Sequence, residues 1–269
     1  MNGNAVAQQA YAIGLILYYP EESLIKRVNL MVEHGFKVYI FDNSPFETRY
    51  NYIFEGSQEV TYLTAGKNVG IGFSLSTICA TAFAHGYRQL LFLDQDTGIS
   101  NRTLNFINNF SKSLAINVLN QYAALVFNGS PSEELAVKDV RLAINSGSLY
   151  NLPVLEKIGW INENYFVDCV DYEFCVRARR SGFKIGLIKN APDFDHITEQ
   201  PDRAINIFGK QVLIRRYNLS RISDALDAYA KIIFGGLLKN SIGDTVALIK
   251  SASIYVVNQV IARLIPEKK

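Results

Sequence analysis

The sequence predicts an α/β domain with a mostly parallel sheet covered by helices. Short apolar runs rich in Ile, Val, Leu, Phe and Tyr alternate with segments of helical periodicity through the first two thirds of the 269 residues. A composition that is 49% hydrophobic and 19% charged supplies material for a large core. In such sheets ligands bind beyond the carboxyl ends of the strands. The residues that directly follow each strand are therefore the candidates for function.

The first part of the chain predicts strands and helices in alternation. The strands are expected at 12–18, 37–41, 59–63, 89–93 and 123–127, and the helices at 21–33, 73–85 and 104–119. The first helix follows Pro20 with Glu21 and Glu22, where acidic side chains meet the positive end of the helix dipole. His34-Gly35 is typical of its end.

The second part predicts a helix at 170–180, closed by Ser181-Gly182, and a strand at 183–188. Beyond Arg203 only helices are expected, with a last helix at 245–264. One helix there should bury an apolar stripe formed by Ile222, Leu226, Tyr229, Ile233 and Leu237. Lys250 and Arg263 bracket only twelve uncharged residues, which predicts a helix too short in apolar length to span a membrane. The chain should thus divide into residues 1–202 and a helical extension, 203–269.

Charge is distributed unevenly between these two parts. The chain carries a net charge of +2, yet residues 203–269 hold 11 Lys and Arg against four Asp and Glu. That part therefore has a net charge of +7, which leaves −5 for residues 1–202. The acidic part is suited to holding a metal ion. The basic part is suited either to an anionic lipid surface or to ordinary solvation, and the charges alone favour neither.

Cysteine usage and the N-terminus bear on the compartment. Cys79, Cys169 and Cys175 are odd in number and form no CxxC pair, so we expect no disulfide and a reducing compartment. The N-terminus lacks a basic start and a small-residue cleavage site, and its apolar run ends at Pro20. We therefore expect a first strand there and no signal peptide.

Carboxylates follow two of the expected strands. Asp42 ends the second strand, and Asp94 and Asp96 end the fourth. A lone Asp after a strand is usually a turn former or a helix cap. Two carboxylates at alternate positions repel each other, and a hard divalent cation such as Mg²⁺ or Mn²⁺ removes that cost. The pair at 94 and 96 therefore predicts a metal site, although Asp-x-Asp by itself is a weak motif.

A glycine-rich segment lies between the third and fourth strands, at 65–73. Gly66, Gly70 and Gly72 precede a helix and suggest close backbone approach to a phosphate or sugar. A dinucleotide-binding fingerprint is the alternative. It lacks its third glycine here and follows the third strand rather than the first.

The helix at 170–180 begins with Asp171, which is either a partner for the helix dipole or a general base. From spacing alone the structural interpretation is favoured. His196 is the one histidine of the C-terminal half, and it is either a satisfied polar group or a metal ligand.

Together these segments resemble the inverting glycosyltransferases of family 2, and within them the rhamnosyltransferase-like branch that builds bacterial surface polysaccharides. The resemblance covers about residues 11–200. Its segments, in order, are Leu17-Tyr18-Tyr19-Pro20, Phe41-Asp42-Asn43-Ser44, Asn68-Val69-Gly70-Ile71-Gly72, Phe92-Leu93-Asp94-Gln95-Asp96-Thr97, Asn145-Ser146-Gly147-Ser148-Leu149, Phe166-Val167-Asp168-Cys169-Val170-Asp171-Tyr172-Glu173, Arg177-Ala178-Arg179, Gly182-Phe183 and His196.

The resemblance implies a GT-A fold, with a Rossmann-like mixed sheet flanked by helices over residues 1–202 and a C-terminal helical extension. It also implies roles. Asp171 is the catalytic base, Asp96 and His196 bind the metal, and Asp42 contacts the pyrimidine ring. The remaining donor contacts would come from Tyr18, Asn43, Lys67, Asn68, Gly70, Asp94 and Gln95. The family commonly has Glu-Asp at the base, where this chain has Val170-Asp171, so Asp168 and Glu173 stay open as alternatives.

The implied reaction uses Mg²⁺ or Mn²⁺ and moves a sugar, with dTDP-β-L-rhamnose or UDP-galactofuranose as candidate donors, to a saccharide or lipid-linked saccharide. The enzyme is expected in the cytoplasm, peripheral at the inner face of the cell membrane. Residues 203–269 would contact the anionic membrane surface or a second copy of the chain. No nucleic-acid partner is expected. The competing classes are a nucleotidyltransferase, an oxidoreductase and a non-catalytic glycan-binding protein.

Overall fold

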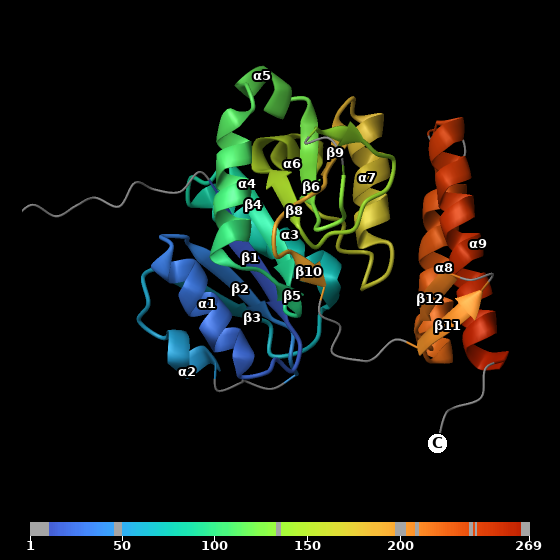
Figure 1. Ribbon diagram of the computed structural model, residues 1–269, viewed down its shortest axis with the longest axis horizontal. Coiled ribbons are helices and arrows are strands. Elements are labelled where there is room, and N and C mark those ends of the chain that lie inside the picture. Colours follow the sequence, from blue (N-terminus) through green and yellow to red (C-terminus); the bar gives the residue numbers. More distant parts are fainter. Residues whose placement is uncertain are drawn as a thin grey trace, which may run out of the picture. The chain divides into compact units, whose positions relative to one another are not determined.

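The computed structural model describes residues 11–45, 50–132, 136–196, 203–207, 210–236, 239 and 241–264. Side chains are described throughout these ranges except at 50–51, 116, 196, 203–207 and 210–214. The chain forms two compact units, Met1–His196 and Ile197–Lys269 (Figure 1). Each unit is held together by its own internal contacts.

The first unit contains an eight-stranded mixed sheet with the order β3-β2-β1-β4-β8-β6-β9-β7. Its first four neighbours in space, β3, β2, β1 and β4, are parallel, whereas β8 runs antiparallel to both β4 and β6. The strands are β1 (Ala12–Leu17), β2 (Val38–Asp42), β3 (Val60–Thr64), β4 (Gln89–Asp94), β6 (Tyr122–Phe127), β7 (Lys138–Asp139), β8 (Ser148–Asn151) and β9 (Lys184–Ile188). A separate two-stranded ladder joins β5 (Thr97–Gly98) to β10 (Asp195–His196).

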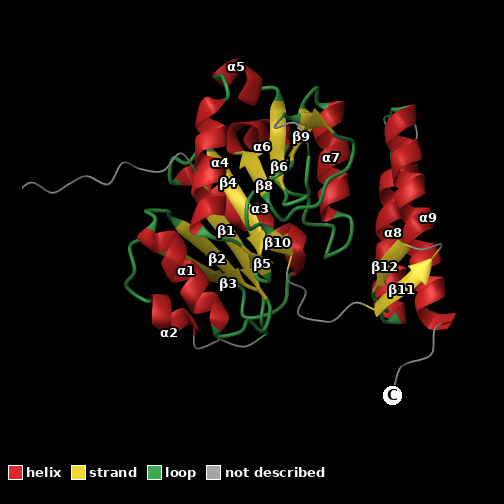
Figure 2. Ribbon diagram, in the orientation of Figure 1, coloured by secondary structure: helices red, strands yellow, loops and turns green. Residues whose placement is uncertain are grey.

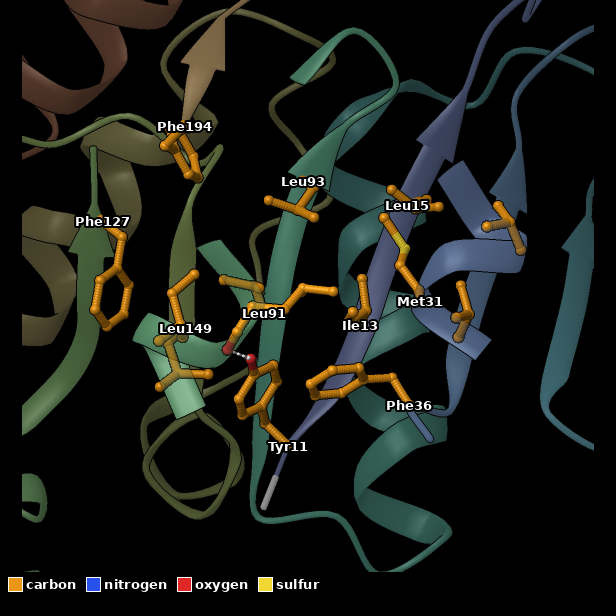
Figure 3. Close-up of a cluster of buried hydrophobic side chains, with 14 of the residues drawn as sticks. Tyr11, Ile13, Leu15, Met31, Phe36, Leu91, Leu93, Phe127, Leu149 and Phe194 are labelled. Atoms are coloured by element: carbon orange, nitrogen blue, oxygen red, sulfur yellow. Dashed lines mark hydrogen bonds between the residues drawn. The ribbon is translucent and has the colours of Figure 1, made fainter. Parts of the chain in front are cut away.

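Helices cover both faces of this sheet, as Figure 2 shows. Side chains of α1 (Ser23–Glu33) and α4 (Asn101–Ser113) join one face in a continuous apolar core that includes Ile13, Leu15 and Leu91 (Figure 3). In that core the Tyr11 hydroxyl donates to the carbonyl oxygen of Leu104 at 3.3 Å. The opposite face carries α3 (Gly70–Ala84), α6 (Leu152–Ile158) and α7 (Val170–Arg180). Two short helices, α2 (Tyr50–Phe54) and α5 (Ile116–Leu119), complete the unit.

The expected elements of this unit are confirmed, with local corrections. The helix expected at 104–119 is two helices, because the chain leaves the helical conformation at Leu114, with φ −78° and ψ 131°. The central strand β8 was not expected, since its four residues follow a Ser-Gly turn and show no alternating pattern. The three cysteines are buried free thiols, in accord with the absence of a disulfide framework.

The second unit corrects the expectation of helices alone. An antiparallel hairpin of β11 (Arg203–Ile207) and β12 (Lys210–Ile214) precedes α8 (Leu219–Phe234) and α9 (Ile242–Leu264). The two helices pack together, and the hydroxyls of Tyr229 and Ser251 lie 2.9 Å apart. Gln259 of α9 anchors the segment after the hairpin, since it accepts from the Tyr217 amide at 3.1 Å and donates to the Arg215 carbonyl at 2.9 Å.

The buried faces of α8 and α9 differ from the expected ones. On α8 the buried residues are Ala225, Ala228, Tyr229 and Ile232, whereas Leu226 is 40% exposed and Leu237 lies outside the described residues. Helix α9 is long and apolar enough to cross a membrane by length and composition alone, with mean hydropathy 1.4 over its most apolar window. The sequence had predicted an apolar segment too short to span a membrane. That prediction was wrong because it counted only the residues between Lys250 and Arg263, whereas the helix begins at Ile242.

Candidate active site

The carboxyl ends of β1, β2 and β4 form one edge of the sheet. Strand β1 lies between the other two, and its last residues pair with both: Leu17 with Asp42, and Ile16 with Asp94. The parallel register therefore brings two of the carboxylates that the sequence analysis selected to the same edge. This is the edge at which an open α/β sheet binds its ligand.

Asp94 is a partly buried carboxylate that is costly to ionise. Burial, and next the charge of Asp96, raise the pKa of Asp94 to about 7, and a hydrogen bond with Ser146 opposes the shift. Ser146 holds this strand end in place: its hydroxyl accepts from the Asp94 amide at 3.1 Å and lies 2.7 Å from the Thr97 hydroxyl. Strand β8 thus begins directly beside the carboxylate pair.

Asp171 lies in the first turn of α7. The helix begins after Cys169, whose left-handed backbone, with φ +63°, turns the chain into the first turn. Burial, together with the charges of Asp168 and Asp94, raises the pKa of Asp171 to about 7, against the Tyr172 amide that donates to its Oδ1 at 2.8 Å. That Asp171 and Asp94 share one cleft, as their implied roles require, stays a prediction.

Glu173, an open alternative for the base, is held by Arg177. The Arg177 Nε donates to Glu173 Oε1 at 2.8 Å, and both side chains are mostly buried. The same guanidinium donates to the carbonyls of Ile158, Gly159 and Trp160. Arg177 thus joins α7 to the residues at the end of α6 and just after it, and Glu173 has a structural role because it holds Arg177 in place. Asp168 lies near enough to Asp171 to raise its pKa, and its part in the site stays open.

His196 is placed by its backbone. The β5–β10 ladder pairs His196 with Thr97, so the backbone of His196 lies opposite the residue that follows Asp96. The His196 side chain lies outside the described residues. Within the part of the chain that the structure describes, no group of three or more His, Cys, Asp or Glu is arranged to hold a metal ion. Two mutually repelling carboxylates nevertheless fit a hard divalent cation, which would remove the cost of ionising both.

Asp42 and Asn43 are occupied by protein groups. Asp42 is 1% exposed, its Oδ1 accepts from the Ser44 amide at 2.9 Å, and its Oδ2 accepts from the Tyr62 hydroxyl. The Asn43 Oδ1 accepts from the Val69 amide at 2.9 Å. Both side chains therefore build the edge of the sheet. A direct contact with the donor, expected for both, stays a prediction.

Gly70 and Gly72, at the start of α3, allow close packing inside the protein. A Cβ at Gly70 would lie 2.5 Å from the carbonyl oxygen of Phe166, and one at Gly72 would meet the carbonyl oxygens of Tyr165 and Asn162. Both glycines thus pack against the segment that leads into α7, and their approach to a phosphate or sugar stays a prediction. Asn68 caps the turn by accepting from the Gly70 amide at 3.0 Å, and Lys67 beside it is exposed.

Tyr18 and Tyr19 follow β1 and project into solvent, with 47% and 56% of their surfaces exposed. The Gln95 side chain bonds to the Tyr18 backbone. Sequence reasoning assigned no role to three supporting residues, Ser44, Tyr62 and Ser146. Ser44 and Ser146 lie within segments that carry the resemblance, and Tyr62 lies on β3. The available signal was their polar character near the candidate site residues.

The chain is similar to the dTDP-rhamnosyl transferase RfbF of Shigella flexneri, with 24% identity over 236 residues. The match covers 77% of this chain and 76% of that protein. No protein-family model matches the chain.

Among solved structures the chain is similar to S. aureus TarS, with a TM-score of 0.57, 14% identity and 90% of this chain covered. It spans 42% of TarS, less than half of that protein's length. It also matches S. aureus TarS 1–349 in complex with UDP-GlcNAc, with a TM-score of 0.55, 13% identity, 92% of this chain and 72% of that one. A third match is GalNAc-T7 with UDP, GalNAc and Mn²⁺, with a TM-score of 0.54, 10% identity, 82% of this chain and 48% of that one.

These findings confirm the predicted fold class, a GT-A-type mixed sheet flanked by helices, and the resemblance to rhamnosyltransferase-like glycosyltransferases of family 2. They support glycosyltransfer as the general activity.

Proposed function

We propose that the chain is a metal-assisted inverting glycosyltransferase that moves L-rhamnose from dTDP-β-L-rhamnose to a hydroxyl of a saccharide or lipid-linked saccharide in surface polysaccharide synthesis. The observation that carries the proposal is the pair of mutually repelling carboxylates, Asp94 and Asp96, at the carboxyl end of β4 in a sheet of GT-A type. The donor is supported by the sequence likeness to a dTDP-rhamnosyl transferase.

Asp96, with His196, would hold Mg²⁺ or Mn²⁺, which when bound supplies positive charge for the diphosphate leaving group. A divalent ion is supported by the raised pKa of Asp94 and by the Mn²⁺ named in the GalNAc-T7 structure. Asp94 would contact the ribose or sugar of the donor. Tyr18, Lys67 and Asn68 would lie along the nucleotide.

Asp171 would accept the proton of the acceptor hydroxyl as that oxygen attacks the anomeric carbon. A pKa of about 7 suits this role, because a general base works best when its pKa lies near the operating pH. The bond to the nucleoside diphosphate breaks on the opposite face of the sugar. A single displacement inverts the anomeric configuration, so a β-L-rhamnosyl donor would give an α-L-rhamnoside.

A UDP-linked sugar is the second candidate donor. The structural neighbours include complexes with UDP-GlcNAc and with UDP and Mn²⁺, and UDP-galactofuranose is the UDP-linked donor that the sequence resemblance implies. The two donor classes share a pyrimidine nucleoside diphosphate and differ in the 5-methyl group of the base, the 2′-hydroxyl and the transferred sugar, so a single panel separates them.

The test is donor hydrolysis with dTDP-rhamnose, UDP-galactofuranose, UDP-GlcNAc and NAD, each with Mn²⁺ and with EDTA. We expect Mn²⁺-dependent release of dTDP from dTDP-rhamnose, and slower or no release from the other donors. Faster turnover of a UDP-sugar would transfer the proposal to that donor. Binding of NAD without any nucleotide-sugar hydrolysis would contradict glycosyltransfer.

We also propose that the second unit lies on the inner surface of the cell membrane. Helix α9 exposes an apolar stripe within about a 100° arc, formed by Ile242, Val246, Ile249, Val256, Val257, Val260 and Leu264. Its opposite face carries Asp244, Ser251 and Gln259, which make contacts inside the unit. Because this polar face is engaged, a helix lying on the surface is favoured over one that crosses the membrane.

The membrane test compares vesicles of phosphatidylglycerol with vesicles of phosphatidylcholine. Deletion from Ser241 onward, and the exposed double substitution Ile249→Asn with Val256→Asn, should each reduce sedimentation with anionic vesicles. Ile254→Asn is the matched control, since Ile254 is 51% exposed but lies off the stripe. Unchanged sedimentation of the double variant would refute membrane contact, and a loss of dimer by that variant would assign the stripe to a second copy.

A further inference from the structure

The turn after β1 adopts a conformation that its own sequence does not favour. Tyr19 has φ +47°, in the left-handed region that residues with a Cβ seldom occupy. Such a conformation persists when surrounding contacts determine it, and it occurs often at functional sites. The contacts around Tyr18 and Tyr19 therefore bear on what the turn does.

Side chains from both neighbouring strand ends hold this turn. From the β4 end, the Gln95 amide bonds to both backbone groups of Tyr18: Oε1 accepts from the Tyr18 N–H at 2.8 Å, and Nε2 donates to the Tyr18 carbonyl at 3.0 Å. From the β2 end, the Ser44 hydroxyl accepts from the Tyr19 N–H at 2.9 Å. The two-point contact fixes the orientation of the Gln95 amide, because only one arrangement supplies both a donor and an acceptor.

The held turn presents two aromatic rings to solvent. The rings of Tyr18 and Tyr19 meet edge to face, with centroids 4.7 Å apart, and about half of each residue is exposed. They directly follow β1, the strand whose neighbours end in Asp42 and Asp94. Exposed aromatic rings held in a fixed orientation are suited to stacking against a nucleotide base.

We infer that Gln95 is a positioning residue that sets the affinity for the donor nucleotide by clamping the Tyr18 backbone, and that it does not contact the donor itself. This differs from the direct contact that the sequence resemblance implies for Gln95. The clamp joins the Asp94–Asp96 turn to the aromatic pair, so the metal-binding and base-stacking parts of the site share one support. The inference rests on the proposed function, because it concerns a pyrimidine nucleoside diphosphate.

The clamp requires glutamine at position 95, because the side chain must both accept from and donate to the Tyr18 backbone. Met has similar length but can make neither hydrogen bond. Glu keeps an acceptor for the Tyr18 N–H, but it places a carboxylate against the Tyr18 carbonyl and next to Asp94 and Asp96. Gln95→Met and Gln95→Glu should therefore both release the turn, and they differ in the charge that they introduce.

The experiment is a double-mutant cycle with Tyr18→Leu, read by calorimetric titration of dTDP and of UDP with Mn²⁺. Gln95→Met and Tyr18→Leu should each raise the Kd on the order of tenfold, as expected for loss of one stacked base. The double variant should match Tyr18→Leu alone, because Gln95 acts through Tyr18. A full additional loss from Gln95→Met in the Tyr18→Leu protein would show direct donor contact and overturn the inference. Gln121→Met, on the exposed surface, is the matched control for the same chemical change.

A readout without ligand separates this inference from the proposed function. Hydrogen exchange of the peptide containing Tyr18 and Tyr19 should accelerate in Gln95→Met while the rest of the first unit keeps its protection. Unchanged exchange would refute the clamp. Failure of the unaltered chain to bind either nucleotide would contradict the proposed function, and accelerated exchange in the variant would still establish the clamp. In transfer assays Gln95→Met should raise the donor KM more than it lowers kcat, whereas a general loss of structure would lower the melting temperature and kcat together.

Discussion

Strands β2 and β4 both end in a carboxylate at the same edge of the sheet, yet the two carboxylates differ in the hydrogen-bond donors and charges that surround them. Asp42, at the end of β2, accepts hydrogen bonds on both oxygens from Ser44 and Tyr62 and is 1% exposed. Asp94, at the end of β4, has its pKa raised to about 7 by burial and by Asp96. The first carboxylate is satisfied within the protein, and the second would be easier to ionise beside a bound cation, as proposed above.

The difference shows that position at a strand end does not by itself identify a ligand-binding group. What separates the two carboxylates is the balance between donors and like charges around each. A carboxylate with enough protein donors stabilises the fold. A pair of carboxylates without enough hydrogen-bond donors is costly to ionise, and a bound cation removes that cost. Four substitutions test this division, and they are taken from the largest expected effect to the smallest.

Asp96→Ala should abolish Mn²⁺-dependent binding of the nucleoside diphosphate, because the metal loses its main carboxylate ligand. We expect a loss of affinity on the order of a hundredfold or more, since metal ligands contribute strongly to such sites. Calorimetric titration of dTDP with Mn²⁺ and with EDTA measures it. Retained Mn²⁺-stimulated binding would show that the β4 end is not the metal site.

Asp171→Asn should keep nucleotide binding and lose most transfer, on the order of 10² to 10⁴ in kcat, because the proton acceptor is removed. In the unaltered protein, kcat/KM should fall as the pH drops below about 7, where Asp171 becomes protonated. A pH profile between 5 and 9 with each variant checks both points. Normal turnover by Asp171→Asn would move the base to Asp168.

Asp42→Ala should lower the free energy of unfolding by about 2–4 kcal/mol, because it leaves the Tyr62 hydroxyl and the Ser44 amide without this acceptor in a buried place. Urea unfolding of the variant measures the change. Asp42→Asn, which keeps one acceptor oxygen, should lose less. A stable Asp42→Ala protein that has lost nucleotide binding would instead place Asp42 among the donor contacts.

In contrast to Asp42→Ala, which should destabilise the protein, Asp94→Asn should stabilise the metal-free protein above pH 7. The folded pKa of Asp94 lies above its unfolded value, so its favourable contribution is complete below pH 4 and is lost as the pH rises through about 7. The gain at pH 8 should be about 1 kcal/mol, since Asp94 is only partly buried and solvent reduces the cost of its charge. Melting temperatures at pH 5 and pH 8 provide the check, and equal shifts at the two values would contradict it.

The first unit was predictable because its strands β1 to β4 are short apolar runs separated by helical periodicity, which local sequence expresses directly. Strand β8 (Ser148–Asn151) was not predictable, because it forms by pairing with β4 and β6, which lie earlier in the chain. The hairpin of β11 and β12 was missed for a similar reason. Its two strands pair with each other, and the helical periodicity of the residues that follow gave no sign of that pairing.

Within the site, sequence reasoning selected polar and charged residues at the strand ends, and the structure places Asp94 and Asp96 at the end of β4. The convergence of Asp171 with them stays a prediction. Asn43 and Gly70 also make contacts inside the protein, to Val69 and to Phe166, which the sequence did not indicate. The sequence contains the polar atoms of Gln95 and Asn43 but not the partners that occupy them. Those partners come from other strands, so only the folded chain reveals them.

The two glycines at the start of α3 also set a rule for engineering the specificity of this protein. Gly70 and Gly72 touch the backbone at 162–166, and this segment leads into the helix that begins with Val170 and Asp171. Any side chain at 70 or 72 would push apart stretches that lie more than 85 positions from each other in the sequence. A mutant library aimed at new donors should therefore keep both positions invariant and diversify the exposed Lys67. Substitutions at Lys67 leave the contact between the start of α3 and residues 162–166 unchanged.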